Sequence, residues 1–133
     1  MEEINQWCFA CGPANPIGLK LEFQEMQDTY CAKFVAGPEH QGYDGIVHGG
    51  IVSTLLDEVM ARYIFVKGVN AVTARLEVRF RQPTPIAQEL TITAKIAGKT
   101  RNIYDMTADV RLPDGTVTAQ GKAKVAVVTG VIS

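Results

Sequence analysis

One segment, residues 49–65, has the apolar spacing of a helix and is apolar on more than one side. A helix that lies on a protein surface needs only one apolar stripe, facing the core. This segment has two neighbouring stripes, in each of which apolar residues recur every fourth position. They are formed by Ile51, Leu55, Val59 and Tyr63, and by Val52, Leu56, Met60 and Ile64. We therefore expect a long helix that the rest of the chain covers on several sides.

Segments that alternate apolar and polar residues precede and follow this helix, as half-buried β-strands do. The predicted strands are residues 19–23, 30–35, 71–82, 89–97, 103–112 and 116–128. Short turns between successive strands favour antiparallel pairing. A single helix is covered on several sides only if the sheet curls around it. The sequence therefore predicts an irregular leader, residues 1–18, and one α+β domain, residues 19–133, whose curved antiparallel sheet of about six strands surrounds one central helix.

Size and charge exclude several classes of protein. The chain has 133 residues, the size of one ordinary domain with its own core. It carries 13 basic and 14 acidic residues, and this near-neutral balance argues against a general nucleic-acid binder. No run is long and apolar enough to span a membrane, and the first residues lack the apolar stretch of a signal peptide. We expect a cytoplasmic protein that binds neither nucleic acid nor membrane.

The leader contains a Cys-x-x-Cys pair, Cys8 and Cys11. This is the spacing of half a zinc site, which needs a second pair of ligands. The other candidate ligands, Cys31, His40 and His48, show no such pairing in the sequence. An odd number of cysteines also argues against a disulfide framework. We expect two thiols packed in an N-terminal turn, with no metal and no cofactor.

The start of the helix combines one histidine with two glycines, His48, Gly49 and Gly50. Glycines leave backbone N–H groups uncovered at the positive end of a helix, where an oxyanion or a polarised carbonyl binds. Nine residues after the histidine, Asp57 lies on an otherwise apolar helix, where an acid is costly unless it has a function. Glu58 is a competing acid, but it lies about 100° around the helix, so the two cannot point at one site. The spacing from His48 favours Asp57.

These residues resemble the hotdog thioesterases of the phenylacetate-degradation type. The resemblance covers about residues 19–128. It rests on His48-Gly49-Gly50 with Asp57 at the family's spacing, and on a strand that opens Ala71-Val72-Thr73 and ends Phe80-Arg81-Gln82-Pro83. The resemblance implies a hotdog fold and the hydrolysis of acyl-CoA thioesters without metal or redox cofactor. It also implies a homodimer or a dimer of dimers.

The resemblance assigns a role to each catalytic candidate. The Gly49 N–H would bind the thioester oxygen, and Asp57 would be the nucleophile or the general base. Thr73 would orient the acid or the attacking water, and His48 would position the thioester or the loop. In this family the acid acts across a dimer interface, facing the Gly49 of the neighbouring subunit. Some members carry a catalytic asparagine six residues before the histidine, where this chain has Gly42.

Strand alternation makes Thr73 a difficult candidate. Strict alternation places Thr73 with Arg75 and Glu77, on the face opposite Leu76. Thr73 would then reach a site only if that end of the strand lies at a subunit junction.

Three arginines along the same strand, Arg75, Arg79 and Arg81, form a basic row. Such a row is either a solvated face or a contact surface for the phosphates of coenzyme A, which arginine binds well. Together with Gly50, these arginines are the predicted substrate-binding residues.

Two rival functions stay open on the sequence alone. A non-catalytic acyl-CoA-binding or sensing protein on the same fold would bind without turnover. A hotdog dehydratase or hydratase would also act on acyl thioesters, with a histidine and an acid in a different sequence context. The sequence does not identify the acyl group of the substrate. It also does not distinguish coenzyme A from acyl carrier protein as the carrier of that group.

Overall fold

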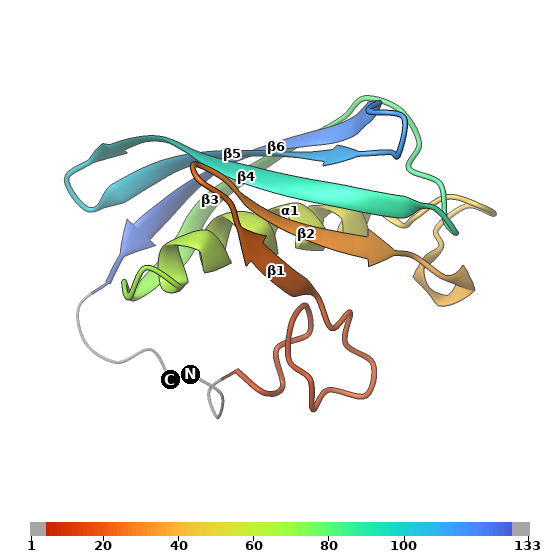
Figure 1. The fold of residues 1–133 in the computed structure, drawn as a ribbon, viewed down its shortest axis with the longest axis horizontal. Helices are drawn as coiled ribbons and strands as arrows, with labels where there is room; N and C mark the ends of the chain where they lie inside the picture. The colour runs from red at the N-terminus through yellow and green to blue at the C-terminus, as the bar shows by residue number, and fades with distance from the viewer. Residues whose placement is uncertain (1–4, 129–133) are drawn as a thin grey trace.

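The long helix α1, Gly49–Phe65, lies across one face of a single curved sheet (Figure 1). The computed structural model describes residues 5–128. Every strand pairs antiparallel, in the order β1-β2-β4-β5-β6-β3. The strands are β1 (Glu22–Glu25), β2 (Tyr30–Val35), β3 (Ala71–Phe80), β4 (Glu89–Thr100), β5 (Ile103–Arg111) and β6 (Val117–Val127), with a short 3₁₀ turn η1 at Pro38–His40. The predicted curved sheet of six strands around one helix is confirmed.

The predicted bounds of α1 and β2 are confirmed, but the first strand is displaced. The prediction placed it at residues 19–23, whereas β1 is Glu22–Glu25. The N–H groups of Leu19 and Leu21 instead donate to leader carbonyls, those of Phe9 and Ala10, at 2.8 and 2.9 Å. The leader therefore takes hydrogen bonds that a longer β1 would have used.

The core lies between α1 and the concave face of the sheet. Both predicted apolar stripes contribute to it, and the buried residues of the helix are Val52, Leu55, Leu56, Val59, Met60, Tyr63 and Ile64. Full burial of each such side chain contributes about 1.5–3 kcal/mol. The helix crosses β6 at Gly121, where an added Cβ would lie 3.1 Å from Met60 Cε and 3.4 Å from Leu56 Cβ. A glycine at this position lets the helix approach the middle of the sheet closely.

Strand β3 lies at one edge of the sheet and departs from simple alternation. Thr73 pairs with Val125 of β6, but Arg75 pairs with Lys124, so Ala74 is an extra residue in the ladder. A bulge of this kind reverses which residues face each side of a sheet. Thr73 therefore faces α1, together with Leu76, and the prediction that it shares a face with Arg75 is wrong.

Among residues 5–128, no helix is both long enough and apolar enough to cross a membrane. The cytoplasmic location expected from the sequence stays a prediction.

Candidate active site

His48 caps the first turn of α1 through its side chain. Its Nδ1 accepts a hydrogen bond from the Gly50 N–H at 2.9 Å. The His48 carbonyl accepts from the N–H groups of Ile51 and Val52, at 2.9 and 3.1 Å. Because Nδ1 acts as an acceptor, the proton of the neutral ring resides on Nε2. The ring can therefore donate a hydrogen bond from its outer edge to a bound group.

The N–H of Gly49 has no acceptor among the described residues, whereas the next three N–H groups of the helix are all engaged. It lies at the positive end of a helix of 17 residues, where a partial negative charge is stabilised. A Cβ added to Gly49 would be 3.5 Å from Phe80 Cζ, an ordinary contact. The Gly49 N–H is thus a free donor among the described residues, and its predicted role in binding a carbonyl or an oxyanion stays a prediction.

A largely apolar hollow of about 650 Å³ opens beside His48 and Gly49. Its walls come from the loop before α1, from the first turn of the helix and from the chain after β3. Apart from His48 and Gly49, they consist of Gly42, Tyr43, Ile46, Val47, Val52, Phe80, Arg81, Gln82, Pro83 and Thr84. The hollow has the size and character of a site for a small organic group.

Asp57 is half-buried, two turns along α1, and hydrogen-bonds to the edge strand. The Thr73 hydroxyl donates to Asp57 Oδ1 at 2.7 Å. The bulge at Ala74 turns Thr73 toward the helix and so permits this contact. A charge-assisted hydrogen bond of this length fixes the orientation of the carboxylate. Strict strand alternation predicts that Thr73 reaches the site only at a subunit junction, but its contact with Asp57 forms within one chain.

The four predicted catalytic residues form two groups that lie apart within a single chain. Asp57 follows Gly49 by eight residues on the same helix. At the helical rise per residue, their backbones are roughly 12 Å apart. One chain therefore unites His48 with Gly49, and Asp57 with Thr73, but it does not place the acid next to the Gly49 N–H.

Two further glycines lie against the His48 side chain. The Gly50 N–H is already bonded to Nδ1, and a Cβ at this position would be 3.1 Å from that nitrogen. Gly50 therefore leaves room for the ring, and its predicted part in binding substrate stays a prediction. A Cβ at Gly42 would be 3.3 Å from His48 Cα. Gly42 thus adjoins the histidine, at the position where some hotdog thioesterases carry an asparagine.

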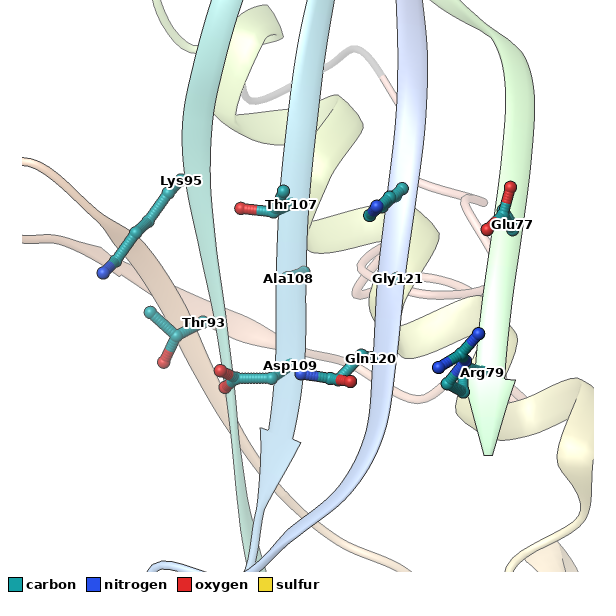
Figure 2. Close-up of a pocket in the computed structure, with 10 residues that line it drawn as sticks. Glu77, Arg79, Thr93, Lys95, Thr107, Ala108, Asp109, Gln120 and Gly121 are labelled. Atoms are coloured by element: carbon teal, nitrogen blue, oxygen red, sulfur yellow. The ribbon is translucent and has the colours of Figure 1, made fainter. Parts of the chain in front are cut away.

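The three arginines of the predicted basic row lie in three different surroundings. Arg81 lines the hollow beside Gly49. Arg79 lines a separate hollow of about 370 Å³ on the outer face of the sheet. Figure 2 shows Arg79 on β3, Thr107 on β5 and Lys95 on β4, with α1 behind the strands. Arg75 is exposed and lies 3.9 Å from Glu77, in a surface ion pair. The predicted part of these arginines in binding substrate stays a prediction.

Glu58, the competing acid, contacts the leader instead of the site. The Cys8 thiol donates to Glu58 Oε2 at 3.8 Å. Burial, followed by the hydrogen bond and negative charge of Glu58, raises the pKa of Cys11 far above its ordinary value. The sequence pattern did not reveal this grouping, because Glu58 lies 50 residues from Cys8 and has no ligand spacing that links it to the Cys-x-x-Cys pair.

Comparison with known families identifies the family of this chain. The model of the thioesterase superfamily matches residues 44–119, more than half of the chain. The chain belongs to the thioesterase superfamily. The match includes the His48-Gly49-Gly50 segment, Asp57 and Thr73.

Two curated relatives of this superfamily member are named as acyl-coenzyme A thioesterases. The bovine protein THEM4 is 31% identical over 68 residues, which are 51% of this chain and 27% of that protein. Mouse acyl-coenzyme A thioesterase 13 is 28% identical over 87 residues, 63% of this chain and 62% of that protein. The chain thus spans less than two thirds of the length of either relative.

Solved structures confirm the hotdog fold of this superfamily member. A crystal structure of a thioesterase superfamily protein has a TM-score of 0.85 and 27% identity, and the match covers 92% of this chain and 61% of that one. The PaaI protein of E. coli has a TM-score of 0.79 at 18% identity, covering 86% and 84% of the two chains. A hypothetical thioesterase of Streptococcus pneumoniae, solved with coenzyme A, has a TM-score of 0.76 at 21% identity, covering 85% and 91%.

Proposed function

We propose that this chain is an acyl-CoA thioesterase, which hydrolyses a thioester to a free acid and coenzyme A. The observation that carries the proposal is the hydrogen bond of 2.7 Å from Thr73 to Asp57. It holds a half-buried carboxylate in one orientation on a helix that contributes seven buried apolar side chains to the core. An acid held in this way has one oxygen engaged and the other available to act on water.

The reaction follows from the chemistry of these groups. As general base, Asp57 takes a proton from water, and the resulting hydroxide attacks the thioester carbon. Negative charge then collects on the carbonyl oxygen, which the Gly49 N–H stabilises, while His48, which lines the same hollow, positions the thioester. Collapse of the intermediate breaks the carbon–sulfur bond, and the coenzyme A thiolate leaves and is protonated. As nucleophile, Asp57 would instead form an anhydride that water then hydrolyses.

The complete site needs two copies of the chain, because Asp57 and Gly49 are roughly 12 Å apart on one helix. The edge strand β3 supports this assembly. Its outer edge is unpaired in the sheet described here, and Leu76 and Phe80 on it are 38% and 54% exposed. A long edge strand with exposed apolar side chains is a surface for pairing with another chain. We infer a homodimer, or a dimer of dimers, in which each Asp57 faces the Gly49 of a partner.

The apolar hollow beside Gly49 would hold the acyl group, and arginines would bind the phosphates of coenzyme A. Arg81 is the best placed, since it lines that hollow. Arg79 on the outer face could bind the same phosphates only from a different copy of the chain. The Streptococcus pneumoniae relative, whose structure was solved with coenzyme A, supports this class of ligand.

A thiol-release assay over short, long and aromatic acyl-CoAs, run beside Asp57→Asn, tests the proposal. We expect turnover of at least one substrate, and its loss in the variant. Tight binding of acyl-CoA by calorimetry without any release would instead identify a sensor. Hydration or dehydration of an enoyl-CoA or hydroxyacyl-CoA, with no thiol release, would identify a hydratase or dehydratase.

A further inference from the structure

A second cluster of chemically active side chains lies where the leader packs on α1, outside the proposed active site. It consists of Cys8 and Cys11 from the leader and Glu58 from α1, and we call it the leader cluster. One ligand atom from each of these residues lies within 4.8 Å of those of the other two. All three side chains are half-buried. We propose that the leader cluster binds a zinc ion, which fastens the leader to the helix.

The spacing of the donor atoms suits zinc after a small contraction. A tetrahedral zinc ion, with bonds of about 2.3 Å to sulfur and 2.0–2.2 Å to oxygen, holds its donors about 3.5–3.8 Å apart. The Cys8 sulfur and Glu58 Oε2 are already 3.8 Å apart. The cluster would close on a metal by moving side chains by about an ångström or less, without rearrangement of the backbone.

The backbone of the leader is built to bring the two sulfurs together. The Gly12 N–H donates to the Cys8 carbonyl at 2.8 Å, which closes the turn. A Cβ at Gly12 would lie 2.4 Å from the Cys8 nitrogen and 2.3 Å from the Gln6 carbonyl oxygen. Only glycine fits there, so this turn depends on the residue that directly follows the second cysteine.

Charge balance is the second argument for a divalent cation. Two thiolates and one carboxylate carry three negative charges, which a zinc ion and one arginine together neutralise. That arginine is present: Arg62 Nη1 donates to the Cys11 sulfur at 3.6 Å. Its guanidinium carbon is also 5.1 Å from the centre of the Phe23 ring. Arg62 is thus held in place beside the sulfur, as residues that support metal ligands are.

A fourth ligand position is open to water. A hollow of about 220 Å³ adjoins the leader cluster, with Asn5, Ala61 and Phe65 among its walls. A zinc ion with two sulfurs, one carboxylate oxygen and one water has the usual four ligands. The site is separate from the proposed reaction, because Glu58 points about 100° around the helix from Asp57.

Cobalt titration of the full chain, expressed without a polyhistidine tag and stripped with a chelator, tests this proposal. Co²⁺ serves as the spectroscopic probe, and Zn²⁺ is then added in competition. We expect one equivalent of Co²⁺ to give the sulfur-to-cobalt charge-transfer band, and one equivalent of Zn²⁺ to displace it. With zinc at about a hundred times its dissociation constant, Tm should rise by about 5–10 °C.

Three variants and one control locate the site. Cys8→Ser and Cys11→Ser should each remove about half of the charge-transfer band, since each removes one of two thiolates. Glu58→Gln, which keeps the size of the side chain, should weaken Co²⁺ binding at least about tenfold. Cys31→Ser is the matched control, because Cys31 lies on β2 and pairs with Thr93 on the other face of the sheet. It should leave binding unchanged.

Several results would overturn the proposal. One is the absence of a charge-transfer band in the reduced wild-type chain. Another is a band that Cys31→Ser removes, or that Glu58→Gln leaves at full affinity. None of these measurements depends on thioester hydrolysis. The proposal of a zinc site and the proposed function can therefore be contradicted independently of each other.

Discussion

Asp57 and Glu58 are neighbours in the chain and carry the same charge, yet their surroundings differ completely. Asp57 meets the Thr73 hydroxyl of the edge strand at 2.7 Å, whereas Glu58 meets the Cys8 thiol of the leader at 3.8 Å. The helix turns successive side chains by about 100°, so one residue of difference selects another neighbour. The comparison teaches that position around α1, more than acidity, separates the proposed catalytic acid from the proposed metal ligand.

Exchange of the Asp57 carboxylate for an amide gives the largest expected effect. Asp57→Asn keeps the shape but cannot take a proton from water, so kcat should fall about 10³-fold with a small change in KM. Steady-state thiol release measures both constants. Glu77→Gln, at an exposed acid on β3, is the control. If Glu58→Gln abolishes turnover while Asp57→Asn retains it, Glu58 and not Asp57 is the catalytic acid.

Removal of one N–H group at the start of α1 ranks second. Gly49→Pro deletes the unpaired donor at a helix position that suits proline, so kcat should fall about 10²-fold while the fold persists. Gly49→Ala keeps the N–H and should retain most of the activity. Circular dichroism checks the helix in both variants. Equal activity of the proline and alanine variants would show that this donor takes no part.

Loss of the hydroxyl that holds Asp57 ranks third. Thr73→Val removes a hydrogen bond to a charged group, worth about 1.5 kcal/mol, so kcat should fall about tenfold. Thr73→Ser restores the hydroxyl and should recover activity to within about threefold. The ratio of kcat between the serine and valine variants is the measurement. A ratio near one would mean that Thr73 contributes packing alone.

Removal of a charge beside the hollow gives the smallest expected effect. Arg81→Gln should raise KM for acyl-CoA about threefold, and the increase should shrink at high salt because exposed charges are screened. Lys33→Gln is the matched control, because Lys33 lies on β2 and is paired with Glu89 of β4. The measurement is KM for acyl-CoA at two ionic strengths, in the variant and in the wild-type chain. An unchanged KM in the Arg81 variant would move the phosphate site to Arg79.

Sequence patterns predicted the parts of the fold that depend on long, regular spacing. The helix is Gly49–Phe65 in both the prediction and the structure, because its apolar stripes reveal the period and a glycine pair precedes them. The position of His48 before the first turn was predicted for the same reason. Its use of Nδ1 as a cap was not, because that bond depends on side-chain geometry.

The apolar spacing did not predict two contacts, since each depends on an irregular feature. For Thr73, only the resemblance to hotdog thioesterases implied that it orients the acid. Thr73 reaches Asp57 only through the extra residue Ala74, and a one-residue bulge leaves no mark in an alternating pattern. Glu58 joins Cys8 because the folded leader returns to α1, a contact across 50 residues of chain. Local spacing carries no information on such a return.

The edge strand β3 has a consequence for how the proposed activity varies with dilution. β3 holds Asp57 through Thr73, and it also exposes the edge through which copies would join. If two copies share each site, a lone chain has an oriented acid and no thioester oxygen donor beside it. The rate per chain should then fall as the protein is diluted below its dimer dissociation constant. The total rate of hydrolysis would then rise more than linearly with the amount of protein that a cell makes.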